Sequence, residues 1–208
     1  VNADIVCLQE FWFANEELRA LYSRRMCEEG GYALEELRRS SIWRQRDDGL
    51  AVFVKKERLT IQDTRDIIFH DCGDRVAKMM LLAYKTPVPN HDGKEEEEEE
   101  MPSQQLIVVN THLLFPHNEN SNKIRLREVT KILGFVEEYR QRELCETVCS
   151  RTDVRIPVFI AGDFNGSPEG KVARMLQQHS YQNAYASISS KSWVSHRSHR
   201  QDDLPVDH

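Results

Sequence analysis

Residues 156–167, IPVFIAGDFNGS, constrain the fold more than any other part of the chain. The apolar start of this stretch is typical of a buried strand, which ends where glycine and polar residues begin. Because side chains alternate along extended backbone, Asp163 and Asn165 are expected to point to one side, while Phe164 turns back toward the interior. A carboxylate and a carboxamide therefore converge at one end of a predicted sheet.

Polar side chains also border three other apolar runs. These runs are ADIVCLQ (residues 3–9) before Glu10, VAKMMLLAY (residues 76–84) after Arg75, and LIVVN (residues 106–110), which leads to His112. Each run predicts a buried strand, and each polar residue has two interpretations. Glu10 is a surface carboxylate or a metal ligand, and Arg75 forms a surface salt bridge or binds a phosphate. His112 is a hydrogen-bonded structural histidine or a catalytic one.

Helical periodicity separates the predicted strands. An amphipathic helix follows Asn15 and stops at the two glycines 30–31, and a second one runs from residue 126 past residue 139. A third is expected from Pro168 to about Gln178, with Ser167 as its N-cap. Shorter strands are expected at residues 50–54 and 67–69, and within 32–43. This order of strands and helices predicts an α/β fold in one domain.

Residues 86–105 interrupt the pattern with three prolines and six consecutive glutamates. A stretch with almost no apolar side chains cannot offset the entropy lost on ordering, so a disordered acidic insertion between two strands is expected. The alternative is an acidic tract that binds a basic partner. The six glutamates account for the formal net charge of -6, so the rest of the chain is near neutral. Charge alone therefore indicates no partner and argues against broad nucleic-acid binding.

Cysteine count and missing motifs exclude several classes of protein. Five cysteines without close repeated spacing favour reduced thiols in an intracellular compartment, the cytoplasm or the nucleus. No apolar run approaches the roughly 18 residues that span a bilayer. The sequence contains no GxxxxGK[ST], GxSxG or HExxH. An EF-hand loop starting at Asp163 needs glycine at its sixth position and glutamate at its twelfth, where Pro168 and Arg174 stand.

The side chains at the predicted strand ends suit the hydrolysis of a phosphate ester. In that reaction one carboxylate holds a metal ion against a phosphoryl oxygen, and another orients or deprotonates the attacking water. Amide and imidazole donors neutralise the charge that develops. Asp207 adds a carboxylate near the end of the sequence. His196, within the polar segment 192–200, contacts phosphate oxygens or belongs to an ordinary surface loop.

Five segments follow one another along nearly the whole chain: ADIVCLQE, DDGLAVFV, VVNTHLLFPHNENSNKIRLREV, IPVFIAGDFNGSPEG and WVSHRSHRQDDLPVDH. In this order they resemble the motifs of the endonuclease/exonuclease/phosphatase superfamily, which has the DNase I-like fold. The NTHL, IRL and GDFN segments are similar to its CCR4/nocturnin-like branch, and WVSHRSHR is most similar to a plant and protist subgroup described as calcium-binding. The resemblance implies a four-layer α/β sandwich with the site at one end of two sheets.

The resemblance also implies roles for single residues. Glu10 matches the family's Mg²⁺-binding glutamate, with Mn²⁺ as the alternative ion, and His112 matches its phosphate-contacting histidine. Asp163 and Asn165 match the pair that positions the water and the phosphate. The remaining matches are Asp207, at the aspartate of the penultimate strand, and Arg75, at a substrate-contacting arginine.

Two features of the family are not found in this sequence. The family begins with a strand that carries an asparagine near the metal, and it ends with a strand that carries an aspartate–histidine pair. His208 follows Asp207 directly and is not that histidine. Residues 1–208 are therefore expected to form one partial domain without its first and last strands. The resemblance implies a Mg²⁺-dependent phosphoester hydrolase acting on RNA, a nucleotide or another phosphate ester. The alternative is a truncated or non-catalytic module of the same fold that binds phosphate or nucleic acid.

Overall fold

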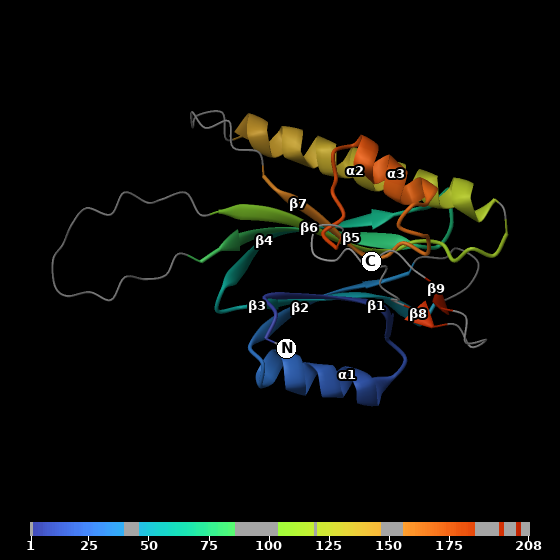
Figure 1. Cartoon of the computed structure of the whole chain (residues 1–208). Coiled ribbons are helices and arrows are strands. Elements are labelled where there is room, and N and C mark those ends of the chain that lie inside the picture. The colour runs from blue at the N-terminus through green and yellow to red at the C-terminus, as the bar shows by residue number, and fades with distance from the viewer. Residues whose placement is uncertain are drawn as a thin grey trace.

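The computed structural model describes residues 2–39, 46–85, 104–118, 120–146, 156–185, 196–197 and 203–204. Within these ranges two β-sheets face each other, and helices lie on the outer face of each sheet (Figure 1). The expected mixed α/β fold with two sheets is confirmed. No helix in the described ranges is long and apolar enough to cross a membrane.

The smaller sheet has the antiparallel strand order β1–β3–β2. Its strands are β1 (Ile5–Trp12), β2 (Tyr32–Arg38) and β3 (Asp48–Lys55). The outer face of this sheet is covered by α1 (Glu16–Tyr22), which continues into a π-helical turn, η1 (Ser23–Glu28). Asn15 caps α1 as predicted, because its side-chain oxygen accepts the Leu18 N–H at 3.0 Å.

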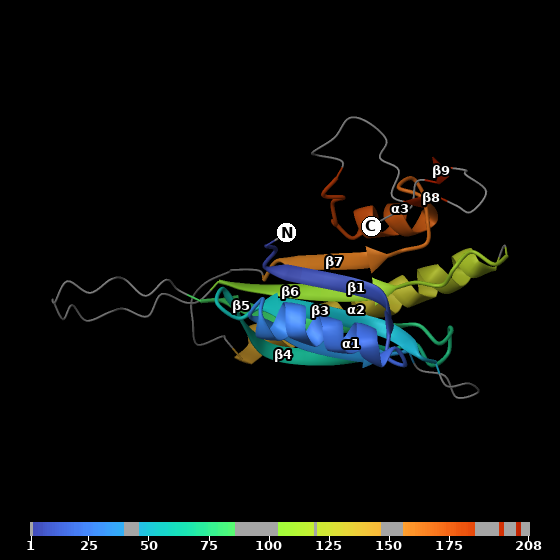
Figure 2. The ribbon, with the colours of Figure 1, turned by 90° about the horizontal axis from the view of Figure 1, so that it is seen from below.

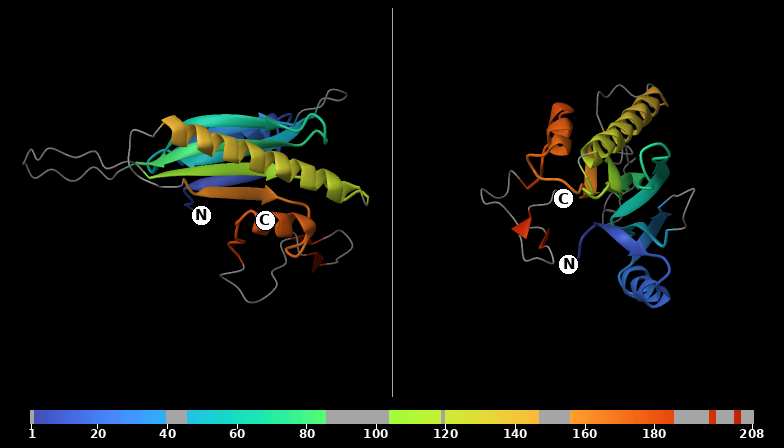
Figure 3. Two further views of the ribbon diagram at one scale, coloured as in Figure 1. Left: turned by 90° about the horizontal axis from the view of Figure 1, so that it is seen from above. Right: turned by 90° about the vertical axis from the view of Figure 1, so that its right-hand side faces the viewer.

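The larger sheet has the order β4–β5–β6–β7, and its last two strands are parallel. The strands are β4 (Leu59–Ile68), β5 (Val76–Tyr84), β6 (Gln105–His112) and β7 (Val158–Asp163). Parallel neighbours need a crossover connection, and α2 (Ser121–Glu146) supplies it. Together with α3 (Lys171–Gln178), α2 covers the outer face of this sheet (Figure 3). A separate antiparallel pair consists of β8 (His196–Arg197) and β9 (Asp203–Leu204).

Both faces of β5 and β6 are buried. Alternate side chains pack between the two sheets, as Met80 and Val108 do against Val52. The intervening ones pack beneath α2, as Met79 and Val109 do. Burial on both faces explains why these strands are near-continuous apolar runs in the sequence rather than alternating ones.

Asn110 joins the two sheets inside the core. Its side chain is fully buried, and its Oδ1 accepts a hydrogen bond from Gln9 Nε2 at 2.7 Å. Its Nδ2 donates to the carbonyls of Leu8 and Ala51 at 3.0 and 3.1 Å. One residue of β6 therefore binds both β1 and β3, two positions before His112, and so fixes how the ends of the two sheets lie against each other.

We expect Asn110→Ala to lower the free energy of unfolding by about 2–4 kcal/mol, because the substitution removes three hydrogen bonds made by a fully buried side chain. Gln9→Ala removes only one of these bonds and is expected to cost about 1 kcal/mol. Urea unfolding monitored by circular dichroism measures both values. Equal losses in the two variants would show that Asn110 does not join the sheets as described.

The start of α3 differs from the prediction. The sequence predicts a helix that begins at Pro168 with Ser167 as its cap, but α3 begins at Lys171 and Gly170 takes the N-cap position. The Gly170 N–H donates to the Ser167 carbonyl at 2.7 Å, so a turn forms before the helix does. The predicted end of the helix, about Gln178, is confirmed.

Several strands extend beyond their predicted bounds: β1 continues past Glu10 to Trp12, and β3 covers Asp48–Lys55 where residues 50–54 were expected. β4 covers ten residues, Leu59–Ile68, where the sequence indicated only residues 67–69. β6 begins at Gln105, inside the predicted insertion 86–105. Residues 86–103 of that insertion lie outside the described ranges.

Candidate active site

The ends of β1, β6 and β7 come together at one end of the sheets. His112 and Asp163 are direct neighbours in the parallel register of β6 and β7. β1 lies beside β6 and β7 (Figure 2), and the bond from Gln9 to Asn110 brings its end to the same place. The structure therefore places His112 and Asp163 side by side, and it places Glu10 next to Gln9, which is bonded to β6.

Glu10 occupies a β-bulge. The register of β1 on β3 shifts between Gln9 and Phe11, and Glu10 has a φ of 53°. A non-glycine residue in this conformation is strained, and bulges of this kind redirect a side chain at the edge of a functional site. The residue is exposed and lies within β1, two residues before the strand ends at Trp12.

Arg75 and His112 form a buried pair. Arg75 Nη1 lies 2.7 Å from His112 Nδ1, and the two residues are 7 % and 6 % exposed. A guanidinium can only donate, so Nδ1 is the acceptor and the ring proton is on Nε2. His112 Nε2 lies 3.7 Å from Asp163 Oδ2. The geometry therefore fixes the neutral tautomer of His112 with its N–H directed toward the site.

Burial, together with the Arg75 charge, lowers the pKa of His112 from 6.5 to about 4, although the Asp163 charge acts in the opposite direction. His112 is therefore neutral at physiological pH. Its Nε2–H is therefore available as a hydrogen-bond donor.

We expect the His112 ring to keep its Nε2–H tautomer from about pH 8 to about pH 5. Because the folded pKa lies below the unfolded value of 6.5, its contribution to stability is lost as the pH falls from about 6.5 toward about 4. Two-dimensional ¹H–¹⁵N spectra of the histidine ring, assigned with a His112→Gln variant, measure the tautomer directly. A ring that titrates near pH 6.5 would contradict the arrangement.

Asp163 and Asn165 form a tight turn at the end of β7. Asp163 Oδ1 accepts the Asn165 N–H at 2.8 Å, and Asn165 Nδ2 donates to the Leu113 carbonyl at 2.9 Å. Asn165 has a φ of 50° and is 8 % exposed. Phe164 is buried beneath α2, as predicted. The turn therefore leaves Asp163 Oδ2 as the oxygen of this pair that faces His112.

Gly162 permits the close approach of β7 to β6. Its φ is 140°, and a Cβ atom there would lie 1.9 Å from the Thr111 carbonyl oxygen. Only glycine fits. The glycine in the GDFN segment is therefore what allows Asp163 to lie beside His112.

Two carboxylates near Arg75, those of Asp48 and Asp74, are already bound to other arginines. Arg39 binds Asp48 at 3.0 Å and Asp74 at 2.5 Å, and Arg46 binds Asp74 at 2.6 Å. Within the described ranges Arg75 has no carboxylate hydrogen-bond partner, and its Nε has no partner at all. A buried guanidinium that is not paired with a carboxylate is suited to bind an anion.

The network that joins Arg39 and Arg46 to Asp48 and Asp74 was not predicted from the sequence. Asp48 and Asp74 lie in DDG and GDR segments, which look like ordinary turn signals. The available signal was that both turns lead straight into buried strands, β3 and β5, where a charged residue is costly unless it is paired.

Two predicted site residues are not placed against the others. Asp207 lies outside the described residues. His196 pairs with Leu204 between β8 and β9, and the structure describes only its backbone. Among the described residues no group of three or more His, Cys, Asp or Glu side chains is arranged to hold a metal ion.

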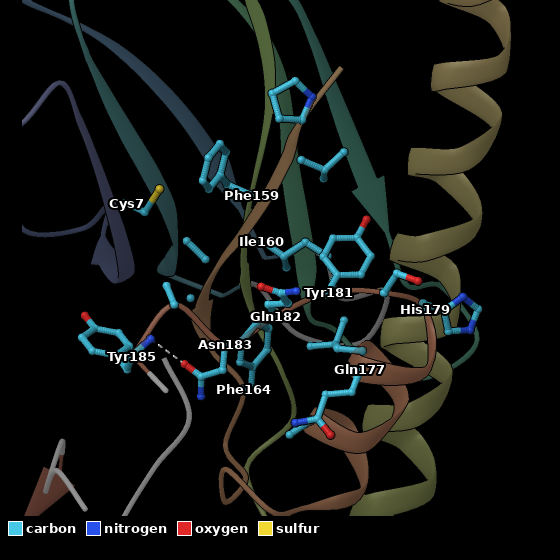
Figure 4. A pocket seen from close by; sticks show the side chains of 18 of the residues that line it. Cys7, Phe159, Ile160, Phe164, Gln177, His179, Tyr181, Gln182, Asn183 and Tyr185 are labelled. Carbon is cyan, nitrogen blue, oxygen red and sulfur yellow. Dashed lines mark hydrogen bonds between the residues drawn. The ribbon is translucent and has the colours of Figure 1, made fainter. Parts of the chain in front are cut away.

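A cavity of about 950 Å³ lies beside β7 (Figure 4). Phe159, Ile160 and Phe164 line it from β7 and the turn, and Tyr181 lines it from the segment after α3. None of the five described site residues lines this cavity, but their neighbours Gln9 and Gly162 do. The cavity therefore borders the site without forming it.

Comparisons with known proteins agree with this geometry. The family model described as "Endonuclease/Exonuclease/phosphatase family" matches residues 1–208. An uncharacterized calcium-binding protein of Arabidopsis thaliana is 34% identical over 99% of this chain. This chain covers 40% of that relative, so it spans about two fifths of the relative's length.

Solved structures show the same fold. The human Nocturnin catalytic domain with bound sulfate matches 90% of this chain and 61% of its own, with 20% identity and a TM-score of 0.64. ANGEL2, a 2′,3′-cyclic phosphatase, in complex with adenosine-2′,3′-vanadate matches 85% of this chain and 44% of its own, with 22% identity and a TM-score of 0.62. The family resemblance of the sequence motifs is confirmed: this chain belongs to the endonuclease/exonuclease/phosphatase family.

Proposed function

We propose that the full-length protein containing this chain is a metal-dependent phosphoester hydrolase whose substrate is RNA or a nucleotide. The observation that carries this proposal is the line of contacts from Arg75 through His112 to Asp163, with Asn165 bound behind it. It places two donors suited to a phosphoryl group next to one carboxylate suited to a water molecule. ANGEL2 was solved in complex with adenosine-2′,3′-vanadate and the Nocturnin domain with bound sulfate, and both ligands support an anionic ligand for this fold.

Glu10 fits the demands of Mg²⁺, with Mn²⁺ as the alternative ion. Mg²⁺ is commonly bound by one or two carboxylates together with water and substrate phosphates. A single exposed carboxylate, redirected by a bulge, is a ligand of that kind. When bound, the ion polarises a phosphoryl oxygen and makes a bound water more acidic.

The other roles belong to side chains of this chain. Arg75 neutralises charge on the phosphoryl group, and the His112 Nε2–H donates to one of its oxygens. Asp163 orients the attacking water and takes its proton. Asn165 holds Asp163 Oδ1 through its backbone N–H. We include Asp207 as a catalytic residue and His196 as a substrate contact on their sequence match alone.

Glu10→Gln is expected to raise the Mg²⁺ concentration needed for half-maximal activity by at least about tenfold. Even the loss of a residue that only orients a metal ligand costs about 10–100-fold in metal affinity. Initial rates measured against Mg²⁺ concentration give the value. Glu17→Gln, an exposed glutamate on α1, is the matched control. An unchanged Mg²⁺ dependence in Glu10→Gln would remove Glu10 from the metal site.

The test of function is a substrate panel for the full-length protein with Mg²⁺ or a chelator. The panel contains oligo(A) RNA, single-stranded DNA, adenosine 2′,3′-cyclic phosphate, NADPH and inositol phosphates. Metal-dependent turnover of RNA or a nucleotide is expected. A folded protein that binds phosphate but turns over no member would favour the alternative, a non-catalytic binding module. We also propose an intracellular location, in keeping with the odd number of cysteines.

A further inference from the structure

The short segment Leu113–Leu114 follows His112 and connects the two halves of the site. The Leu113 N–H donates to the Asp163 carbonyl at 2.9 Å, and the Leu113 carbonyl accepts from Asn165 Nδ2 at 2.9 Å. Leu113 is fully buried. The position of this segment therefore sets how His112 lies relative to Asp163 and Asn165.

Two charged side chains of α2 bind the next residue. Glu128 Oε2 accepts the Leu114 N–H at 3.0 Å, and Arg125 Nη1 donates to the Leu114 carbonyl at 3.3 Å. Arg125 is itself bound to Asn122, one turn earlier on the helix. All four backbone groups of Leu113–Leu114 are thus bound, two by the Asp163 turn and two by α2.

Glu128 is an unusual residue for its position. It is 0 % exposed and lies on the same face of α2 as Val129 and Ile132. Its Oε1 has no hydrogen-bond partner in the described part of the chain and lies toward Gly73, where an added Cβ would be 3.6 Å away. Burying a carboxyl group with one oxygen unsatisfied is costly, and an apolar side chain would fill this position at lower cost.

We propose that Glu128, assisted by Arg125, is a positioning residue of the active site: it holds Leu113–Leu114 from α2 and thereby fixes His112 against Arg75 and Asp163. The expected effect of Glu128 on kcat rests on the proposed function. The effect of Glu128 on the position of His112 does not, because it is present in the protein without substrate. Glu128 acts through backbone atoms and touches no reacting group.

The charge state of Glu128 suits this role. Burial raises its pKa from 4.5 to about 7, even though the Leu114 N–H, Arg75 and Arg125 act to lower it. The other charged or titratable groups that face it are Asp74 and Cys72 on the segment before β5. A neutral Glu128 does not compete for the Arg75 guanidinium, which stays available for His112 and a phosphoryl oxygen. Ionisation above about pH 7 adds a buried negative charge beside Arg75.

The test compares Glu128→Gln with Glu128→Leu in the full-length protein. Glutamine keeps an oxygen for the Leu114 N–H, whereas leucine fills the space without one. Arg127→Gln is the control on the same helix, because Arg127 is exposed and bound to Asp71. The readouts are the His112 ring tautomer by ¹H–¹⁵N NMR, and kcat and KM from about pH 6 to about pH 9.

We expect the wild type to lose kcat above about pH 7, where Glu128 ionises, and we expect Glu128→Gln to keep the Nε2–H tautomer without that loss. Glu128→Leu is expected to unfold cooperatively, to show a mixed His112 tautomer, and to lose about 10²-fold in kcat with little change in KM. A leucine variant with the wild-type His112 signals and kcat, and only a lower Tm, would overturn the proposal. The NMR result decides this without turnover, so a wild type that is inactive on the whole panel refutes the proposed function and leaves the positioning test intact.

Discussion

Asp163→Asn is expected to lower kcat of the full-length enzyme by about 10³-fold, the contribution typical of a positioned general base. Asparagine keeps an oxygen for the Asn165 N–H, so the turn at the end of β7 is retained. It loses the negative charge on the oxygen that faces His112 Nε2 at 3.7 Å. Because the substitution is isosteric, we expect the Tm to stay within a few degrees of the wild type.

The control for this variant is Asp71→Asn. Asp71 is exposed, and it pairs with Arg127 and Lys131 on the surface of α2. Exposed ion pairs contribute little, so this variant is expected to keep wild-type kcat. Comparable losses of kcat in both variants, or none in Asp163→Asn, would remove Asp163 from the reaction.

The strands and the strand-end residues could be predicted because local patterns encode them. β5 has the same bounds in sequence and structure, Val76–Tyr84, since a strand buried on both faces is a continuous apolar run. His112 and Asp163 come within two residues of apolar runs and end β6 and β7, and the parallel pairing of these strands makes them neighbours. The alternation of side chains along a strand also correctly predicted that Phe164 points into the interior.

The contacts that organise the site could not be predicted, because they join residues far apart in sequence. Gln9 and Asn110 are 101 residues apart, and Arg75 and His112 are 37 apart. The bulge at Glu10 has no local signal either, since glutamate is not typical of a positive φ. Whether a polar residue in a strand is bonded inside the core or faces solvent depends on these partners.

The sequence of α2 did contain a signal for the role of Glu128. On α2 the buried residues recur at helical spacing, and Arg125 and Glu128 lie on the same stripe as Val129, Ile132 and Val136. The helix was predicted from the apolar residues of that stripe alone. Charged residues at core positions of an amphipathic helix require partners, so they mark where the helix binds something polar.

Glu128→Gln is expected to change the pH dependence of stability. The carboxyl pKa is about 7 in the folded protein against 4.5 for the ordinary group. Between these values the unfolded chain has lost the proton that the folded chain still holds, so the wild type loses about 1.4 kcal/mol of stability per pH unit as the pH rises. Over this window the loss is about 3 kcal/mol, complete above about pH 7. Glutamine does not titrate, so the Glu128→Gln variant does not lose stability over this pH range.

The difference in unfolding free energy between wild type and Glu128→Gln is therefore expected to be constant below about pH 4.5, and the variant gains about 3 kcal/mol relative to the wild type by about pH 8. Urea unfolding at several pH values measures this difference. Glu138→Gln is the control, because Glu138 lies on the same helix with its side chain in solvent and paired to Arg142. A difference that stays constant with pH would mean that Glu128 is not a buried titrating group, since only a group whose proton affinity changes on folding produces a slope.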